Sequence, residues 1–242
     1  MSLVRRSSEH GITTLTLDSP HHRNALSAQL VSELVEGLVA AGEDAGTRAV
    51  LLAHTGNTFC SGADLTEAGA DGPQALVRLM RAVVELPKPV VARVDGHARA
   101  GGLGLLGACD ISVAGEGATF VFTEARIGLA PAVISLPLLP RLDARAAARY
   151  YLTGERFGAA EAVRIGLVTA AEDELEAVLD GLRRGSPQGL AESKALATAG
   201  VRRAFERDAE ALTALSARLF ASSEAREGMA AFLERREPVW AR

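Results

Sequence analysis

The order of hydrophobic and polar residues predicts strands and helices that alternate along the first part of the chain. Short runs that are wholly apolar or alternate with polar residues, as is typical of strands, occur at residues 12–17, 49–53, 90–94, 111–114 and 119–122. Leucines at helical spacing follow Ser27, a suitable N-cap residue, and a second helical pattern covers residues 74–86 until Pro87 interrupts it. Strands interleaved with helices indicate an α/β fold.

The pattern changes in the second half of the chain, which is almost wholly helical from Arg141 onward. Glycines separate the expected short helices, at Gly154, Gly166, Gly185 and Gly200. We therefore predict an α/β core over residues 1–185, followed by a helical region over residues 186–242 that belongs to the same functional unit.

Composition narrows the class of protein. The 242 residues are 48% hydrophobic, enough for a substantial core. The net charge is -4 and there is no Lys/Arg-rich block, so we expect no nucleic-acid partner. The polar N-terminus lacks the apolar run of a signal peptide, and no uncharged apolar stretch reaches the length of a membrane span. Only Cys60 and Cys109 are cysteines, which favours a reducing compartment; we expect a cytoplasmic protein.

Two segments of small residues carry the strongest chemical signal. They are Phe59-Cys60-Ser61-Gly62-Ala63-Asp64-Leu65 and Ala100-Gly101-Gly102-Leu103-Gly104, and each follows a strand-like run. Each segment could turn a free backbone N–H group towards a ligand, and two such donors that converge on one oxygen stabilise an oxyanion. This chemistry belongs to enzymes that act on an activated carbonyl, such as a thioester.

The second segment also matches the dinucleotide-binding pattern, as Gly102-x-Gly104-x-x-Gly107. That site needs a strand that ends at the first glycine and a helix of ordinary length after it. Here the strand ends near Asp95, and only two residues separate Gly107 from the next apparent strand. We therefore expect no nicotinamide or flavin site; close packing of a helix on a sheet is the alternative role of these glycines.

A series of motifs in fixed order identifies a family resemblance. The motifs are Asn24-Ala25-Leu26, the segment 59–65, Pro87-Lys88-Pro89-Val90-Val91-Ala92, the segment 95–102, Cys109-Asp110, the segment 120–128 and the segment 232–238. Together they resemble the crotonase (enoyl-CoA hydratase/isomerase) superfamily, and they cover nearly the whole chain. The ordered set is more specific than any single motif.

The resemblance implies a superhelix of strand–strand–helix (ββα) units with a C-terminal α-helical trimerisation region, so that a homotrimer or a dimer of trimers is expected. It also implies an acyl-CoA substrate whose thioester carbonyl lies between the N–H groups of Ala63 and Gly101. CoA is then part of the substrate, and neither a cofactor nor a metal ion is expected. The residues expected to bind the substrate or its CoA part are Arg23, Ala25, Asp64, Leu65 and Arg235. For both arginines an ordinary solvated surface is the alternative.

The family's hydratases use two glutamates, one to activate water and one to move a proton to or from the substrate's α-carbon. The resemblance places the first at Gly104, which has no side chain, and the second at Glu124. A carboxyl group between an apolar strand and a turn is expected to be desolvated, with a raised pKa. A salt bridge to Arg126 is the alternative role of Glu124.

One remaining carboxylate leaves three functions open. We favour an enoyl-CoA hydratase that reversibly hydrates a 2-enoyl-CoA; a Δ3,Δ2-enoyl-CoA isomerase and a non-catalytic acyl-CoA-binding protein are the alternatives. Glu67 or Asp71 could supply a second base, although a surface position is the simpler expectation for both. Neither the adjacent pair His21-His22 nor Cys60 has the neighbours in sequence that a metal site or a nucleophile requires.

Overall fold

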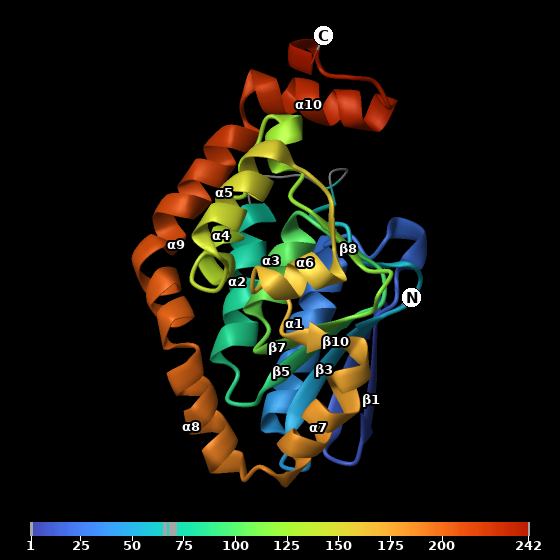
Figure 1. Ribbon diagram of the computed structural model, residues 1–242, viewed down its shortest axis with the longest axis vertical. Helices are drawn as coiled ribbons and strands as arrows, with labels where there is room; N and C mark the ends of the chain where they lie inside the picture. The colour runs from blue at the N-terminus through green and yellow to red at the C-terminus, as the bar shows by residue number, and fades with distance from the viewer. Residues whose placement is uncertain (1, 65–66, 68–71, 242) are drawn as a thin grey trace.

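The computed structural model describes residues 2–64, 67 and 72–241, and its first half is a series of β-β-α units (Figure 1). The units are β1 (Val4–Glu9), β2 (Ile12–Leu17) and α1 (Ala28–Glu43); β3 (Ala49–His54), β4 (Thr58–Cys60) and α2 (Gly72–Glu85); and β5 (Val90–Val94), β6 (His97–Arg99) and α3 (Gly101–Ala108). A fourth pair of strands, β7 (Ile111–Ala114) and β8 (Thr119–Val121), leads into the short helices η2 (Glu124–Ile127) and α4 (Ser135–Leu138). The expected ββα superhelix is confirmed.

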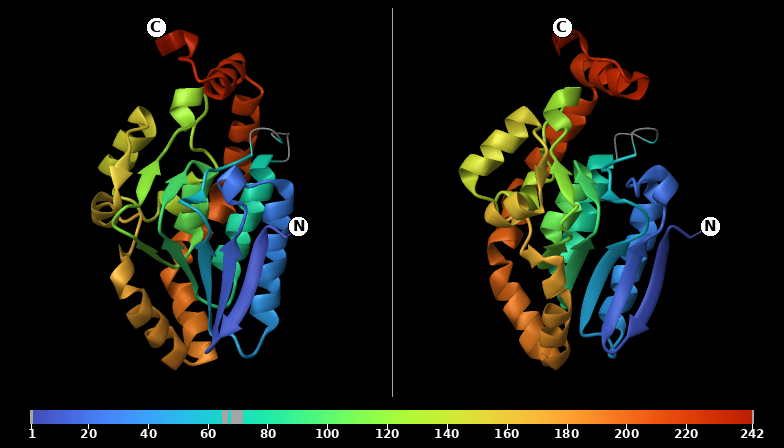
Figure 2. Two further views of the ribbon diagram at one scale, coloured as in Figure 1. Left: turned by 90° about the vertical axis from the view of Figure 1, so that its right-hand side faces the viewer. Right: turned by 45° about the vertical axis from the view of Figure 1, so that its right-hand side comes forward.

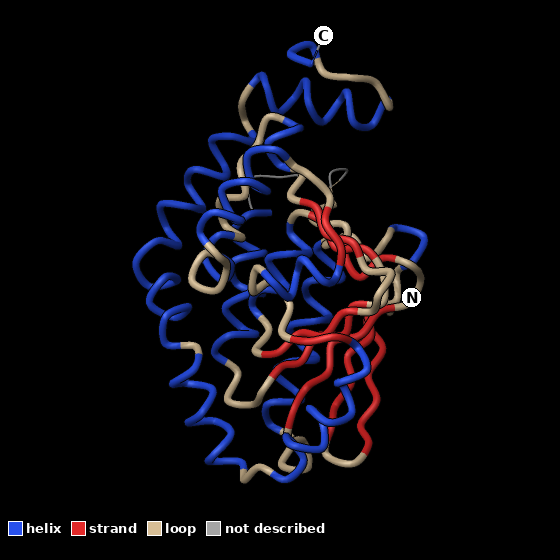
Figure 3. Tube along the Cα trace, viewed as in Figure 1, coloured by secondary structure: helices blue, strands red, loops and turns tan. Residues whose placement is uncertain are grey.

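In the described residues these strands form two sheets, which Figure 3 shows as two groups of red segments. The larger sheet has the order β1-β2-β3-β5-β7-β10 and the smaller has the order β4-β6-β8-β9, with β9 at Phe157–Gly158 and β10 at Ala170–Ala171. From the second unit onward, the first strand of each pair joins the large sheet and the second joins the small one. The chain therefore crosses repeatedly between the two sheets, and the loops after the short strands gather at one end of the small sheet.

The hydrophobic core explains why the predicted elements form where they do. Leu30, Leu34 and Leu38 of α1 are buried, as their helical spacing predicts, and the Ser27 hydroxyl accepts a hydrogen bond of 3.2 Å from the Leu30 N–H. The central strands β3 and β5 are almost wholly apolar because helices and sheet cover both of their faces.

Five of the described strands, β1, β4, β6, β9 and β10, escaped sequence analysis. The edge strand β1 is mostly exposed and polar, so its residues carry no hydrophobic alternation; its backbone pairs with β2 in antiparallel register. The other four have only two or three residues each, too few to produce a periodic signal. They form by pairing: β4 with β6, β6 also with β8, β9 with β8 and β10 with β7.

The second half is helical as predicted. Its α-helices are α5 (Ala144–Thr153), α6 (Ala159–Arg164), α7 (Leu175–Arg184), α8 (Pro187–Ala197), α9 (Ala199–Phe220) and α10 (Ser223–Glu234). The short 3-10 helices η3 (Glu172–Glu174) and η4 (Val239–Ala241) precede α7 and follow α10, and η1 (Pro20–His22) follows β2 in the first half. Helices α8 and α9 run along one side of the molecule, and α10 projects beyond its end (Figures 1 and 2). In the described part of the chain, no helix is long and apolar enough to cross a membrane.

The glycine boundaries hold with one exception. Gly154 and Gly166 follow α5 and α6 with φ of 59° and 81°, a conformation that suits glycine, and Gly185 ends α7. The prediction for Gly200 is wrong, because this residue lies inside the first turn of α9. The break falls at Thr198, whose hydroxyl donates a hydrogen bond to the Lys194 carbonyl and marks the end of α8.

Candidate active site

A cavity of about 890 Å³ lies where the loops after the short strands meet the C-terminal helices. Its wall combines segments that are far apart in the sequence: the turn at residues 21–26, the backbone at 61–64, the start of α3, the start of η2 and the ends of α9 and α10. Apolar side chains form much of the wall, among them Leu76, Ile134 and Phe232.

The two small-residue segments lie against each other in this wall. A Cβ atom added at Gly101 would lie 3.5 Å from the Ala63 nitrogen, and one added at Gly62 would lie 3.1 Å from the Gly101 nitrogen. Neither the Ala63 N–H nor the Gly101 N–H donates a hydrogen bond to any described residue. Two free donors therefore lie side by side at the cavity, as an oxyanion hole requires.

An unusual backbone conformation orients the second donor. Ala100 has φ of 45° and ψ of -121°, a region that residues other than glycine rarely adopt. The surrounding bonds hold it there: the Ala100 N–H donates to the Val121 carbonyl at 3.2 Å, and the Ala100 carbonyl accepts from the Leu103 N–H at 2.8 Å. This turn lets α3 begin at Gly101, with the first N–H of the helix unpaired.

Glu124 follows strand β8 as the first residue of η2, and it lines the same cavity. Its side chain is buried and Oε2 has no hydrogen-bond partner among the described residues. Burial raises the pKa of this carboxyl group to about 7, and hydrogen bonds from the backbone of Glu124 and Thr123 oppose the rise. The raised pKa agrees with the sequence prediction. The alternative role, a salt bridge to Arg126, is wrong, since Arg126 instead donates to the Thr153 carbonyl at 3.3 Å.

The place of the family's first glutamate is filled by other side chains. A Cβ atom added at Gly104 would lie 2.5 Å from Ile134 Cγ2 and 2.9 Å from Met80 Sδ, so no larger residue fits. Gly102 and Gly107 approach Cys60 and Leu138 as closely, with added Cβ atoms at 2.5 Å and 2.6 Å. All three glycines lie within α3, where they serve close packing, the alternative role that the sequence offered.

The residues expected to bind the substrate are brought together in part. Arg23, Ala25 and Asp64 line the cavity with the oxyanion donors. Arg235 does not; it is exposed and ends α10 with φ of 56°, beyond the lining residue Leu233. Leu65 lies outside the described residues.

Sequence analysis missed the structural role of Asn24. This side chain is fully buried, accepts a hydrogen bond from the Ser19 N–H at 2.8 Å and donates to the carbonyls of Thr55 and Thr58 at 3.2 Å and 2.7 Å. It fixes the turn that carries Arg23 and Ala25. An asparagine that combines a buried position with φ of 51° is a structural signal, but burial cannot be read from a single sequence.

Glu67, Asp71, Cys60 and the pair His21-His22 are the weaker candidates from the sequence. Glu67 lines the cavity, and its carboxylate accepts a hydrogen bond of 2.9 Å from the Ala28 N–H; Asp71 lies outside the described residues. Burial raises the pKa of the Cys60 thiol to about 12, which leaves it protonated and a poor nucleophile. His21 and His22 reach the cavity, but no three potential ligands in the described residues gather around a point where a metal ion would fit.

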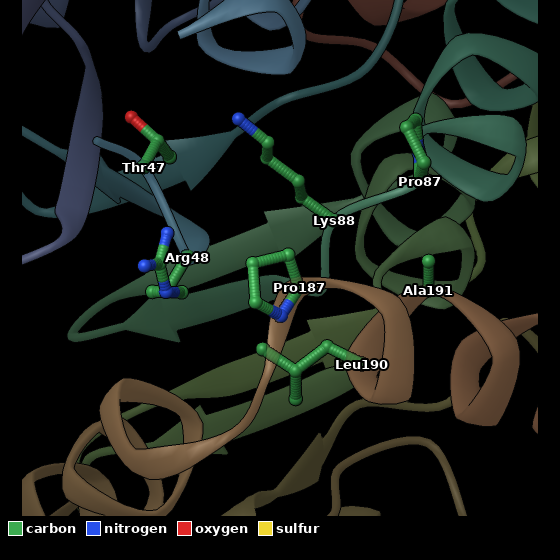
Figure 4. Close-up of a pocket in the computed structure, with 7 residues that line it drawn as sticks. All are labelled: Thr47, Arg48, Pro87, Lys88, Pro187, Leu190 and Ala191. Carbon is green, nitrogen blue, oxygen red and sulfur yellow. The ribbon is translucent and has the colours of Figure 1, made fainter. Parts of the chain in front are cut away.

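A second hollow of about 200 Å³ lies at the opposite end of the fold (Figure 4). It separates the start of α8, at Pro187, from the turns at Arg48 and Lys88, and the Lys88 ammonium group is directed away to the carbonyls of Ala41 and Asp44. Its lining contains no carboxylate, thiol or imidazole, so we assign it no chemistry.

Residues 7–242 match the family described as enoyl-CoA hydratase/isomerase. The chain belongs to this family. The crystal structure of an enoyl-CoA hydratase from Mycobacterium avium is similar at 56% identity, with a TM-score of 0.92 over 99% of each chain.

Relatives with other named substrates are similar over the same length. A carnitinyl-CoA hydratase from Mycobacterium avium is 28% identical, with a TM-score of 0.87 over 100% of each chain. The mevalonyl-coenzyme A hydratase of Aspergillus fumigatus is 32% identical over 245 residues, which cover 95% of this chain and 91% of that protein. Family membership therefore sets the fold but leaves the acyl group unspecified.

Proposed function

We propose that this protein is an enoyl-CoA hydratase, which reversibly adds water to the double bond of a 2-enoyl-CoA. One observation carries the proposal: a buried, unpaired carboxyl group, Glu124, and two free backbone N–H groups, of Ala63 and Gly101, line one cavity. The cavity also has the size and apolar wall that an acyl chain requires.

In this mechanism the thioester oxygen accepts hydrogen bonds from the Ala63 and Gly101 N–H groups, which draws electron density away from the β-carbon. A water molecule attacks the β-carbon while its proton passes to the Glu124 carboxylate, and negative charge develops on the thioester oxygen. Glu124 then returns the proton to the α-carbon as the enolate collapses. Removing one such donor typically costs about 3 kcal/mol of transition-state stabilisation, so the pair is a large part of the catalytic power.

A single carboxyl group is sufficient for this sequence because it both accepts and returns the proton. A pKa of about 7 suits the double role, since neither protonation state is strongly favoured at neutral pH. No second carboxylate takes part at residue 104, because Gly104 has no side chain and Ile134 and Met80 fill the space beside it. Asp64 and Glu67 also line the cavity, but the role of Asp64 in this proposal is to bind the CoA part.

The same observation supports a second candidate, the Δ3,Δ2-enoyl-CoA isomerase. That reaction needs only one group to carry a proton between the α- and γ-carbons, so it does not depend on the carboxylate that Gly104 lacks. The non-catalytic alternative is less favoured, because an acyl-CoA carrier has no use for a buried carboxyl group whose pKa is about 7.

The substrate test separates these functions. Purified protein is incubated with crotonyl-CoA, a 2-enoyl-CoA, and in parallel with 3-hexenoyl-CoA. Formation of 3-hydroxybutyryl-CoA from the first supports the hydratase, whereas conversion of the second to 2-hexenoyl-CoA without hydration supports the isomerase. Binding of both thioesters with turnover of neither would contradict both enzymatic proposals.

The family resemblance also supports a binding mode for CoA and an oligomeric assembly. We infer that Arg23, Ala25 and Asp64, which line the cavity, contact CoA, that catalysis needs no metal ion or further cofactor, and that the protein acts as a homotrimer or a dimer of trimers. CoA contacts of Leu65 and Arg235 stay predictions from the resemblance. Two buried cysteines that form no disulfide, Cys60 and Cys109, support a cytoplasmic location.

A further inference from the structure

A group of arginines without acidic partners lies beside the oxyanion donors. Arg99 ends strand β6, two residues before Gly101, and pairs in register with Val121 of β8. On the other side of β8, Phe120 pairs with Phe157 of β9, so the register brings Arg156 next to Val121. Paired residues of neighbouring strands point to the same face, so Arg99 and Arg156 share one face of the small sheet.

Arg23, in the turn at residues 21–26, is the third arginine of the group. Its carbonyl accepts a hydrogen bond of 3.1 Å from the Ser61 N–H, which fixes the turn of Arg23 beside the end of β4, the neighbour of β6. Arg23 and Arg99 both line the large cavity. Arg156 is exposed and is not part of the lining, but it lies near enough to Arg99 for its charge to act on that residue.

The electrostatics of this cluster are unfavourable in the unliganded protein. None of the three arginines forms an ion pair or a side-chain hydrogen bond with another described residue. Burial lowers the pKa of Arg99, and the positive charges of Arg156 and Arg23 lower it further. His97, on the same face, has a pKa lowered by burial and by the charges of Arg99 and Arg156. Like charges gathered without a counter-charge destabilise a fold unless a ligand supplies one.

We propose that Arg23, Arg99 and Arg156 form an anion-binding site that holds a phosphate or carboxylate group of the substrate bound in the cavity. The site rests on the proposed function, since the anion belongs to the acyl-CoA whose carbonyl lies at Gly101. Guanidinium groups suit this role because their planar donors bind phosphate and carboxylate oxygens in pairs. The anion comes either from the nucleotide part of CoA or from an acidic acyl chain, two sources that share one chemistry.

Equilibrium binding to the variant R99Q tests the site. R145Q is the control, because Arg145 is an exposed arginine of α5 that does not line the cavity. The four ligands are butyryl-CoA, glutaryl-CoA and the matching pantetheine thioesters, which lack the nucleotide phosphates. If the anion is a phosphate, R99Q weakens butyryl-CoA about tenfold and leaves butyryl-pantetheine unchanged. If it is an acyl carboxylate, R99Q weakens both glutaryl thioesters about tenfold and neither butyryl thioester.

The melting temperature of R99Q distinguishes a binding role of Arg99 from a purely structural one. Removal of one of three mutually repelling charges is expected to leave the melting temperature of R99Q equal to or above that of the wild type. R99K keeps the charge but loses the paired donors, so its affinity should lie between those of R99Q and the wild type. Equal affinities of R99Q and R145Q for all four ligands would overturn the proposal, as would a uniform loss that includes butyryl-pantetheine. If the wild type turns over no enoyl-CoA but binds CoA thioesters through Arg99, the proposed function fails and the anion site stands.

Discussion

At the scale of single residues, the candidate active site depends on groups held in states that the fold must stabilise. Ala100 has a backbone conformation that costs on the order of 1–3 kcal/mol, and Glu124 is a carboxyl group removed from water. Both costs fall on residues that line the cavity. This distribution is expected where a protein gives up stability to position reactive groups.

The strain at Ala100 predicts that A100G is more stable than the wild type. Glycine adopts φ of 45° and ψ of -121° without steric cost, and this gain exceeds the added entropy of the unfolded chain by about 1 kcal/mol. Urea unfolding measures the change. A195G, in the helical conformation of α8, is the matched control and should lose about 1 kcal/mol. A loss of stability in both variants would contradict the strain.

The raised pKa of Glu124 predicts a specific dependence of stability on pH. Below about pH 4.5 the carboxyl group is protonated in both states; between 4.5 and 7 the unfolded chain releases the proton while the folded chain keeps it. The free energy of unfolding therefore falls as the pH rises through this window, by on the order of 3 kcal/mol.

The variant E124Q isolates this contribution because glutamine has a similar shape and no titration. Urea unfolding at pH 4.5 and pH 8 should show that E124Q loses less stability than the wild type over the window. Parallel pH profiles of the two proteins would mean that the Glu124 carboxyl group is not buried in the way the structure indicates.

At the scale of elements, α10 packs directly on the turn that carries Glu124. A Cβ atom added at Gly228 of α10 would lie 2.4 Å from the Ile127 carbonyl carbon, and one added at Gly128 would lie 2.5 Å from the backbone of Glu224. Phe232 of the same helix lines the cavity. The position of α10 therefore sets both the orientation of η2 and part of the cavity wall.

Two glycine-to-alanine changes in helices should have opposite effects, because only one of the glycines is in this contact. G228A forces α10 away from η2 and should lower the free energy of unfolding by about 1–3 kcal/mol and reduce turnover. G200A, at an exposed position of α9 where an added Cβ meets no atom within 4 Å, should raise stability by about 0.5–1 kcal/mol. Unfolding and turnover of both variants test the contact, and equal stabilities would contradict it.

The sequence alone predicts those features of the elements that depend on neighbouring residues, and not those that depend on long-range contacts. The alternation in β2, the leucines of α1 and the setting of Glu124 predicted local structure and a raised pKa because each depends on neighbouring residues. Ile134 filling the space beside Gly104 could not be predicted, since thirty residues separate the two. The approach of Arg99 to Arg156 also depends on strand register, which a single sequence does not reveal.

At the scale of the whole molecule, the C-terminal region presents apolar side chains to solvent. Phe232, Leu233, Val239 and Trp240 are between 44% and 60% exposed, all within the segment that projects beyond the core (Figure 2). A cluster of large apolar side chains on a projecting segment is typical of a protein–protein interface.

These exposed residues lead us to expect an oligomer in solution. Light scattering coupled to size-exclusion chromatography should give three or six times the 25.2 kDa mass of the chain. The double variant V239E/W240E, outside the cavity lining, should shift the protein towards smaller species, because charged side chains are depleted from the cores of interfaces. A wild-type protein that is monomeric at micromolar concentration would contradict the trimer.

The central claim is that one carboxyl group and two backbone donors carry out the reaction, and the turnover number of E124Q with crotonyl-CoA tests it most directly. Loss of the only proton carrier in the proposed mechanism should lower kcat about 10²–10⁴-fold. The affinity for butyryl-CoA should stay within a factor of two, since the Ala63 and Gly101 N–H groups are untouched. An E124Q protein that hydrates crotonyl-CoA at the wild-type rate would contradict the account.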